Sequence, residues 1–221
     1  MKGRESRLIA RARGLFTVAA GVGHTDPRAP HATMFHVEQS ALQNAVPARQ
    51  REFLAGRAAA RQAQEALGLV ARPVPVGADR APIWPEGLCG SISHTADTCL
   101  AVVCNDPSVS TIGLDIEEAE PLPDDILETV LTHDEQRWIA QQPDPRLLAR
   151  AIFSAKECAY KAQYPLSRQL FGFEVIAVTP GPGTFEARFT CAIPPFDAGH
   201  MLRGRLSIGD RLILTGMTIP R

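Results

Sequence analysis

The stretch Phe153–Gln163, with the sequence FSAKECAYKAQ, lies in the middle of the segment that decides the fold. Small and apolar residues dominate it, and upstream Asp144-Pro145 has the pattern of an N-cap followed by a first-turn proline. We therefore predict a long helix that begins at Asp144 and ends before Pro165. Its buried stripe, at helical spacing, consists of Leu148, Ile152, Ala155 and Ala159.

Three charged residues in this stretch need an explanation. Glu157 and Lys161 are four residues apart in the favourable order, and an exposed pair of this kind stabilises a helix by about 0.2–0.5 kcal/mol. A solvated helix face is therefore the simplest interpretation. If the helix instead packs against a strand that carries carboxylates, Glu157 becomes a candidate metal ligand or general base. Lys156 and Lys161 would then be placed to contact phosphate oxygens.

The strand that could provide these carboxylates is Ile112–Glu117, IGLDIE, in which apolar residues alternate strictly with other types. Alternation with period two places Asp115 and Glu117 on the same face, about 7 Å apart along the strand. In proteins Mg²⁺ takes one or two carboxylates together with waters and substrate phosphate oxygens. The alternative is an amphipathic strand that exposes its acidic residues to water, and this hexapeptide alone favours that alternative.

Strands and one helix are predicted in the first part of the chain. An Ala-rich helix is expected from Pro47 to Leu67, because a proline opens it and Gly68 follows its end. A connector rich in proline and glycine comes next, over residues 72–87. Strands are predicted at residues 15–21, 91–94 and 99–104.

The second part of the chain has the same alternation of helices and strands. Thr132 and Glu135 form a capping-box pattern ahead of a short helix, and the tail after Gly172 is rich in strand-forming residues. A hairpin is predicted to turn at Gly209-Asp210. This order predicts an α+β fold of two similar halves, residues 1–110 and 111–221.

Composition and charge narrow the class of protein. A chain of 221 residues with 45% hydrophobic residues and a net charge of -1 is typical of a globular protein, with no global preference for nucleic acid or an acidic membrane surface. Residues 1–100 contain 12 Lys and Arg against 8 Asp and Glu, whereas residues 101–221 contain 11 against 16. Such an asymmetry suits a site where an anionic ligand meets a cation held by carboxylates, although loose surface charge would also produce it.

The five cysteines indicate the compartment. Their number is odd and no Cys-x-x-Cys pair occurs, which argues against a disulfide framework or a zinc site and favours a reducing environment. No apolar run approaches the roughly 20 residues that a membrane helix needs. Arg11 and Arg13 interrupt any signal-peptide core near the N-terminus. We expect a cytoplasmic protein.

Basic residues in the first part of the chain are candidates for anion binding. His94 ends the run Ser91–His94, where it could donate a hydrogen bond to a phosphate, although a lone histidine is more often structural. Four arginines lie on the helix predicted from Pro47, and two of them, Arg49 and Arg57, are about two helical turns apart and share a face. Most such arginines are solvated, so we expect one or two of them to bind an anion.

Taken together, these segments resemble the 4′-phosphopantetheinyl transferases of the two-half type, in particular the branch of enterobactin synthase component D. The most specific feature is Gly-x-Asp-x-Glu at residues 113–117 combined with Phe-Ser-x-Lys-Glu-x-x-x-Lys at residues 153–161. Residues 1–46 carry little of the resemblance, and Cys158 stands where the family commonly has Ser or Ala. The matching segments are REFLAGR (51–57), APIWPEGLCGSISH (81–94), IGLDIE (112–117), FSAKECAYKAQYPL (153–166) and LFGFE (170–174).

The resemblance implies a pseudo-twofold pair of α+β halves with the active site in the cleft between them. Residues 1–110 would bind the phosphates of coenzyme A, and residues 111–221 would hold Mg²⁺ and carry the catalytic helix. In the connector both Arg72 and Arg80 fit the expected basic residue, and Arg80 is preferred. The implied metal ligands are Asp115, Glu117 and Glu157, and the implied catalytic residues are Glu157 and Lys161. The implied contacts to coenzyme A are Arg49, Arg57, Arg80, Ser93, His94, Lys156 and Lys161.

The implied reaction transfers 4′-phosphopantetheine from coenzyme A to a serine of an apo acyl or peptidyl carrier protein, and it releases adenosine 3′,5′-bisphosphate. The carrier would belong to a siderophore peptide synthetase, a polyketide synthase or a fatty-acid system, and a monomer is the default expectation. Two other functions stay open. A Mg²⁺-dependent phosphohydrolase acting on coenzyme A or a related nucleotide would use the same carboxylates with water as nucleophile. A coenzyme A-binding or carrier-docking module without catalysis is disfavoured by the intact set of acidic and basic residues.

Overall fold

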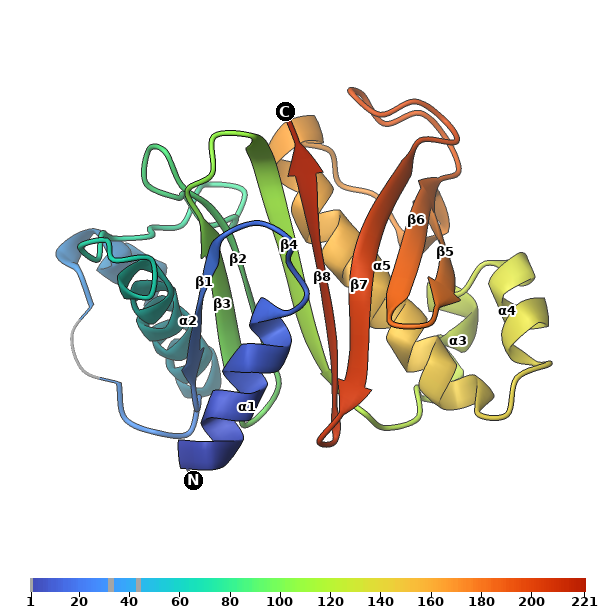
Figure 1. Ribbon diagram of the computed structural model, residues 1–221, viewed down its shortest axis with the longest axis horizontal. Helices are drawn as coiled ribbons and strands as arrows, with labels where there is room; N and C mark the ends of the chain where they lie inside the picture. Colours follow the sequence, from blue (N-terminus) through green and yellow to red (C-terminus); the bar gives the residue numbers. More distant parts are fainter. Residues whose placement is uncertain (1, 32–33, 43–44) are drawn as a thin grey trace. The chain divides into compact units, whose positions relative to one another are not determined.

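The computed structural model describes residues 2–31, 34–42 and 45–221, and the chain divides into two compact units (Figure 1). The first unit contains the chain up to Ile112 together with Pro220–Arg221, and the second contains Gly113–Ile219. Each unit combines an antiparallel sheet with one long helix that packs against it, which confirms the predicted α+β class. Among the described residues, no helix is long and apolar enough to cross a membrane.

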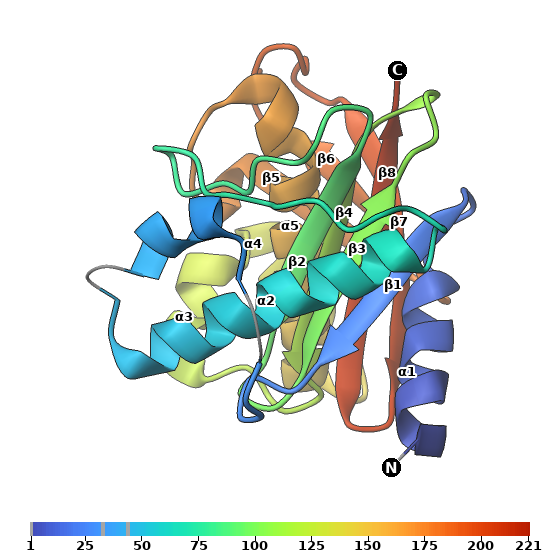
Figure 2. The same ribbon diagram turned by 90° about the vertical axis from the view of Figure 1, so that its left-hand side faces the viewer.

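The first unit is built on a three-stranded antiparallel sheet in the order β1-β3-β2. Its strands are β1 (Ala20–Thr25), β2 (Cys89–His94) and β3 (Cys99–Cys104). Helix α2 (Pro47–Glu65) lies across this sheet, as Figure 2 shows. A short 3-10 helix, η1 (His36–Leu42), precedes α2 in the chain. The predictions of the Ala-rich helix and of the two strands after the connector are confirmed.

Small side chains let α2 approach β1 very closely. A Cβ atom on Gly23 would lie 2.0 Å from the carbonyl oxygen of Ala59, and one on Gly21 would lie 1.9 Å from that of Ala63. Both alanines are fully buried. The helix backbone therefore rests almost directly on the strand, and the alanine-rich face of α2 and the glycines of β1 require each other.

The N-terminal prediction was wrong. A strand was expected at residues 15–21, but the chain begins with helix α1 (Lys2–Arg13), and β1 starts only at Ala20. Leu15 and Phe16 are instead buried in the link after α1, where Arg13 donates a hydrogen bond to the carbonyl of Phe16 at 3.1 Å. Of residues 15–21, Leu15 and Phe16 thus fill the core outside the sheet, and only Ala20 and Gly21 belong to β1.

The second unit contains a five-stranded sheet in the order β4-β8-β7-β6-β5. Helix α5 (Pro145–Ser167) packs against this sheet, and Figure 1 shows it running behind strands β5 to β8. The strands are β4 (Val109–Glu118), β5 (Ile176–Gly181), β6 (Thr184–Phe189), β7 (Met201–Gly209) and β8 (Leu212–Pro220). The shorter helices are α3 (Asp124–Val130), α4 (His133–Ile139) and η2 (Phe173–Val175).

Several local predictions in this unit are confirmed. Thr132 and Glu135 form the capping box at the start of α4, and the Asp144 side chain accepts a hydrogen bond from Leu147 N at the start of α5. The hairpin between β7 and β8 exists, but its two central residues are Asp210 and Arg211. Both have positive φ angles, 48° and 65°, as a two-residue hairpin turn of type I′ requires.

The predicted end of the long helix was wrong. Helix α5 continues through Pro165 to Ser167, where Arg168 adopts a left-handed conformation and its N–H donates to Tyr164 O at 2.9 Å. A proline in the last turn removes one intrahelical hydrogen bond, but here the turn closes beyond it through this cap.

Gly113 marks the point where β4 passes beneath α5. A Cβ atom at this position would lie 2.3 Å from the carbonyl oxygen of Cys158 and 2.9 Å from the side chain of Ala162. The glycine of the Gly-x-Asp-x-Glu motif therefore sets the distance between the strand that carries Asp115 and the helix that carries Glu157.

We predict that Gly113→Ala destabilises the protein by about 1–3 kcal/mol, because the added methyl group collides with a helix backbone that has to shift. Gly3→Ala is the matched control, since among the described residues no atom would lie within 4 Å of a Cβ atom placed there. Urea denaturation of the two variants measures the difference. A Gly113→Ala protein as stable as the Gly3→Ala protein would contradict this account of the β4–α5 contact.

Candidate active site

Asp115 is the centre of a polar cluster in the second unit. It lies on β4 and is 2% exposed. One of its carboxylate oxygens accepts a hydrogen bond from Ser154 Oγ at 2.8 Å, and the other accepts one from Lys161 Nζ at 2.6 Å. The Thr215 hydroxyl of β8 lies 2.9 Å from Ser154 Oγ and 3.0 Å from the carbonyl oxygen of the same residue. Three elements, β4, α5 and β8, thus fix the orientation of this carboxylate.

Lys161 balances the charge of Asp115. Burial acts to lower the pKa of the Lys161 ammonium, but the attraction of Asp115 and Glu157 outweighs it, so the pKa is raised. The group therefore stays protonated over the whole physiological range. The structure pairs Lys161 with a carboxylate 46 positions earlier in the chain.

Glu117, two residues further along β4, has a different partner. Its carboxylate accepts a hydrogen bond from Arg150 Nη1 at 3.0 Å, and the same guanidinium also donates to the carbonyl oxygens of Glu120 and Pro121 at 3.3 Å. Burial raises the pKa of Glu117 to about 7, and repulsion from Asp115 adds to this, while Arg150 opposes it. When ionised, Glu117 thus carries a negative charge that its surroundings only partly compensate.

Glu157 borders a small apolar pocket of about 140 Å³. Burial raises the pKa of its carboxyl group, Lys161 opposes this shift, and Asp115 adds to it. A carboxylate with a raised pKa beside an apolar cavity is a typical general base. The other residues that line the pocket are Lys156, Tyr160, Phe171, Gly172, Phe173 and Ile176.

The structure places Lys156 differently from the prediction. Although it borders the same pocket, it is 2% exposed, and its ammonium group donates to Val130 O, Glu135 Oε2 and Phe173 O at 2.8, 2.8 and 3.0 Å. A lysine has three donors, so this geometry leaves no proton for a phosphate oxygen. We therefore do not keep Lys156 among the candidate phosphate ligands.

The donor chemistry of the three predicted metal ligands fits Mg²⁺. Asp115 raises the pKa values of both Glu117 and Glu157, so each of these two carboxyl groups lies within electrostatic range of Asp115. Within the described ranges, however, no three His, Cys, Asp or Glu side chains converge as they would around a metal ion. Lys161 and Arg150 supply positive charge to Asp115 and Glu117 in this arrangement.

Arg57 is the main feature of a basic cluster in the first unit. It lies on α2, is 7% exposed, and stacks on the ring of Phe53 at 4.2 Å. Burial lowers its pKa to about 10, which leaves it charged at neutral pH. In the part of the chain that the structure describes, its buried Nε atom has no hydrogen-bond partner. A buried, unsatisfied donor on a cation is costly, and an anionic ligand would satisfy it.

Two more predicted residues, Arg49 and His94, share a partner on the same unit. Arg49 Nη1 donates to Glu52 Oε2 at 3.2 Å, and His94 Nε2 lies 3.6 Å from the same oxygen. The charge of Arg49 also acts on Arg57 and lowers its pKa further. Ser93 is buried in β2 beside His94. The structure thus brings Arg49 and His94 to one carboxylate, that of Glu52.

The two candidate basic residues of the connector behave differently. Arg72 donates through Nη2 to Glu86 O at 3.1 Å. Arg80 is exposed in a turn with a φ angle of 68°, and its N–H donates to Gly77 O at 2.9 Å. Among the described residues, no hydrogen bond or ion pair joins Arg80 to the cluster around Arg57. The preference for Arg80 therefore stays a prediction.

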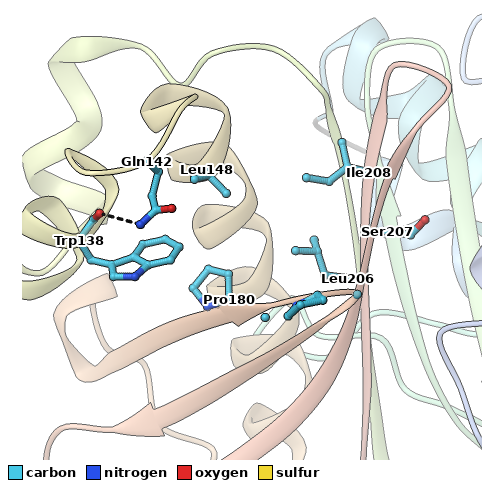
Figure 3. A pocket seen from close by; sticks show the side chains of 10 residues that line it. Trp138, Gln142, Leu148, Pro180, Leu206, Ser207 and Ile208 are labelled. Carbon is cyan, nitrogen blue, oxygen red and sulfur yellow. Dashed lines mark hydrogen bonds between the residues drawn. The ribbon is translucent and has the colours of Figure 1, made fainter.

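A larger hollow in the second unit, of about 560 Å³, lies outside these clusters (Figure 3). Trp138, Leu148, Pro180 and Ile208 face it, and Gln142 donates from its rim to Trp138 O at 3.4 Å. None of the predicted site residues lines this hollow. We therefore place the candidate site at Asp115 and not here.

The raised pKa of Glu117 predicts a pH dependence of stability. Its pKa rises from the ordinary 4.5 to about 7, so between these values the folded protein holds a proton that the unfolded chain has lost. Stability must then fall as pH rises through this range. Because glutamine stays neutral, Glu117→Gln should lose this pH dependence. We compare the melting temperature of the variant with that of the wild type at each pH, without divalent cations. This difference should increase in favour of the variant by on the order of 5 °C between pH 4.5 and pH 7.

Glu118→Gln serves as the control, because Glu118 is the exposed neighbour on the same strand. Thermal melts of the three proteins across this pH range measure the effect. A difference between wild type and Glu117→Gln that does not change with pH would contradict the assignment of the shift to this residue.

Comparison with known proteins shows which family the chain resembles. Residues 37–104 match the 4′-phosphopantetheinyl transferase N-terminal domain, and residues 111–202 match the 4′-phosphopantetheinyl transferase superfamily. The chain is similar to 4′-phosphopantetheinyl transferase Svp of Streptomyces mobaraensis, with 34% identity over 201 residues that cover 87% of this chain and 81% of that protein.

Two further relatives show the same resemblance. 4′-Phosphopantetheinyl transferase Npt of Nocardia iowensis is 32% identical over 192 residues, which cover 81% of this chain and 86% of that protein. Enterobactin synthase component D of Salmonella typhi is 40% identical over 124 residues, 55% of this chain and 51% of that protein. The predicted resemblance is thereby confirmed, and the chain belongs to the 4′-phosphopantetheinyl transferase family.

Proposed function

We propose that this protein transfers the 4′-phosphopantetheine group of coenzyme A to a serine hydroxyl of an apo acyl or peptidyl carrier protein and releases adenosine 3′,5′-bisphosphate. The observation that carries the proposal is the cluster around Asp115, in a chain that belongs to this transferase family. A buried aspartate, two glutamates with raised pKa values and a protonated lysine come from β4 and α5 in one unit. This set suits a reaction at a diphosphate.

The basic cluster of the first unit would bind the phosphates of coenzyme A. Arg57 supports this most strongly, because its buried Nε atom needs an acceptor and has no direct partner among the described residues. Arg49 and His94 would add further donors, with Ser93 beside them. Arg80 is the proposed contact from the connector.

Asp115, Glu117 and Glu157 would hold Mg²⁺. When bound, the ion would neutralise charge on the diphosphate and stabilise the attacking and leaving oxygens. The uncompensated charge of Glu117 and Glu157 supports this role, since both carboxyl groups ionise more readily beside a cation. Arg150 and Lys161 balance the carboxylates in the free protein.

Two residues of the protein would act directly in the transfer, one as the base and one as the cation that stabilises the leaving group. Glu157 accepts the proton of the carrier serine, whose oxygen then forms a bond to the phosphorus that bears pantetheine. The bond between this phosphorus and the bridging oxygen breaks, and the bisphosphate leaves with the electron pair. Lys161, held protonated by its surroundings, stabilises the charge that develops on the leaving phosphate. The apolar pocket beside Glu157 is suited to an uncharged part of a substrate.

A Mg²⁺-dependent phosphohydrolase is the second candidate, because the same carboxylates could activate water. The two functions differ in their need for a carrier. A hydrolase releases the bisphosphate from coenzyme A alone, whereas a transferase releases it only together with modification of a carrier.

We predict that incubation with coenzyme A, Mg²⁺ and an apo carrier adds one phosphopantetheine group to the carrier, as intact-mass spectrometry will show. The panel should contain carriers from a siderophore peptide synthetase, a polyketide synthase and a fatty-acid system. A carrier whose acceptor serine is replaced by alanine is the control and should gain no mass. Release of the bisphosphate without any carrier, with no mass gain on the whole panel, would favour the hydrolase and sink the transferase proposal.

Arg57→Met is predicted to weaken coenzyme A binding without loss of stability. A hydrogen bond to a charged group contributes about 1.5–3 kcal/mol, so the KM for coenzyme A should rise about 10- to 100-fold. The apolar stem can still pack on Phe53, and an unsatisfied buried charge disappears, so the melting temperature should be unchanged or higher.

The exposed Arg51 on the same helix provides the matched control, and Arg51→Met should change this KM by no more than about two-fold. Equal effects of the two substitutions on KM would show that Arg57 acts through general charge and not as a phosphate ligand.

A further inference from the structure

Lys156 and Glu135 form a buried ion pair in the second unit. Their side chains are 2% and 5% exposed, and Lys156 Nζ lies 2.8 Å from Glu135 Oε2. The same ammonium donates to the carbonyl oxygens of Val130 and Phe173. The lysine thus joins α5 to the end of α3 and to the segment that lines the pocket beside Glu157.

Both carboxylate oxygens of Glu135 also accept hydrogen bonds. Its Oε1 atom accepts a hydrogen bond from Val178 N of β5 at 2.6 Å, and its Oε2 atom accepts one from Thr132 N at 2.7 Å in addition to that from Lys156. One side chain therefore caps α4, holds a strand amide and pairs with α5. Such full satisfaction of a buried polar network fixes the relative positions of the elements that it joins.

We propose that Lys156 is a positioning residue for the transfer reaction, acting through Glu135. It directly precedes Glu157 on α5, so fixing its ammonium group fixes the rotation of the helix and the direction of the next side chain. Its bond to Phe173 O at the same time holds the wall of the pocket that Glu157 borders. This inference rests on the proposed function, in which Glu157 is the base.

Stability alone does not account for the pair. Replacing both members of a buried ion pair by apolar side chains of similar volume is often neutral or stabilising, whereas removing one member leaves an unpaired buried charge. Here Glu135→Leu also leaves the amides of Val178 and Thr132 without their acceptor, so the doubly apolar protein should lose some stability while its core stays packed. A positioning role predicts that the doubly apolar protein still folds cooperatively and reacts slowly. A purely structural role predicts that activity returns together with stability.

The first unit contains a similar ion pair, in which a buried carboxylate accepts hydrogen bonds from two backbone amides and from a basic side chain of a long helix. Glu38 of η1 is 1% exposed, and it accepts hydrogen bonds from Val74 N at 2.8 Å, Phe35 N at 3.2 Å and Arg61 Nη1 at 3.3 Å. Arg61 lies one helical turn after Arg57 on α2. The Arg61–Glu38 pair is thus a matched control on the helix that carries the proposed phosphate ligand.

The decisive variant is Glu135→Leu/Lys156→Met, compared with Lys156→Met alone and with Glu38→Leu/Arg61→Met. For the double variant at Glu135 and Lys156 we expect kcat to fall about 100-fold, because a displacement of about 1 Å at a catalytic group has this effect. The KM values for coenzyme A and for the apo carrier should stay close to those of the wild type, and thermal denaturation should be cooperative. The variant at Glu38 and Arg61 should instead raise the KM for coenzyme A through Arg57.

Hydrogen exchange provides a readout that does not depend on activity. In the double variant at Glu135 and Lys156, amides of residues 171–178 should exchange faster, since Phe173 and Val178 lose their bonds to the pair. Amides of β7 should keep their wild-type rates. A wild-type protein that transfers nothing would overturn the proposed function and leave this exchange test valid. A double variant with wild-type kcat, or with unchanged exchange at residues 171–178, would overturn the positioning role.

Discussion

In each unit, one buried carboxylate joins a short helix to the long helix that follows it in the chain. Glu135 receives the Lys156 ammonium, a strand amide and the amide three residues before it. Glu38 receives the Arg61 guanidinium, a backbone amide and the amide three residues before it. The long helices fixed in this way carry Glu157 and Arg57, the residues to which we assign the base and the phosphate contact. The same set of contacts thus recurs in both units.

Local patterns in the sequence predicted much of the fold. The capping box at Thr132, the proline start of α2 and the strand at IGLDIE each depend on neighbours in the chain, and each is confirmed, although residues 112–116 of the strand are buried on both faces. The predictions failed where contacts between residues far apart in the chain determine the local structure. Residues 15–21 were assigned to a strand by their apolar character, but Leu15 and Phe16 fill the core after α1 while the glycines of β1 meet α2. Pro165 stays helical because a cap beyond it closes the last turn.

The candidate site shows the same division between local and distant information. Spacing alone favoured solvated faces for Asp115 and Glu157, and the resemblance to a family made them site candidates. Neither could distinguish the direction of Lys156 from that of Lys161. These two lysines lie five positions apart on one helix, where 3.6 residues per turn direct their side chains to different neighbours. Glu135 was recognised as a capping residue, and its second role as the partner of Lys156 depends on a contact 21 positions along the chain. Ser154 belongs to the quoted Phe-Ser-x-Lys-Glu motif, but its contact with Asp115, like that of Thr215 with Ser154, depends on the folded structure.

A crystal structure of the protein with coenzyme A and Mg²⁺ tests the central claim most directly, which is that adjacent residues of α5 have separate tasks. We expect Mg²⁺ on the carboxylates of Asp115, Glu117 and Glu157 and a phosphate oxygen within hydrogen-bond distance of Arg57 Nε. The ammonium of Lys156 should keep its bonds to Glu135, Val130 and Phe173. A Lys156 side chain turned away from Glu135 to contact a phosphate, or an ion bound away from these three carboxylates, would contradict the account.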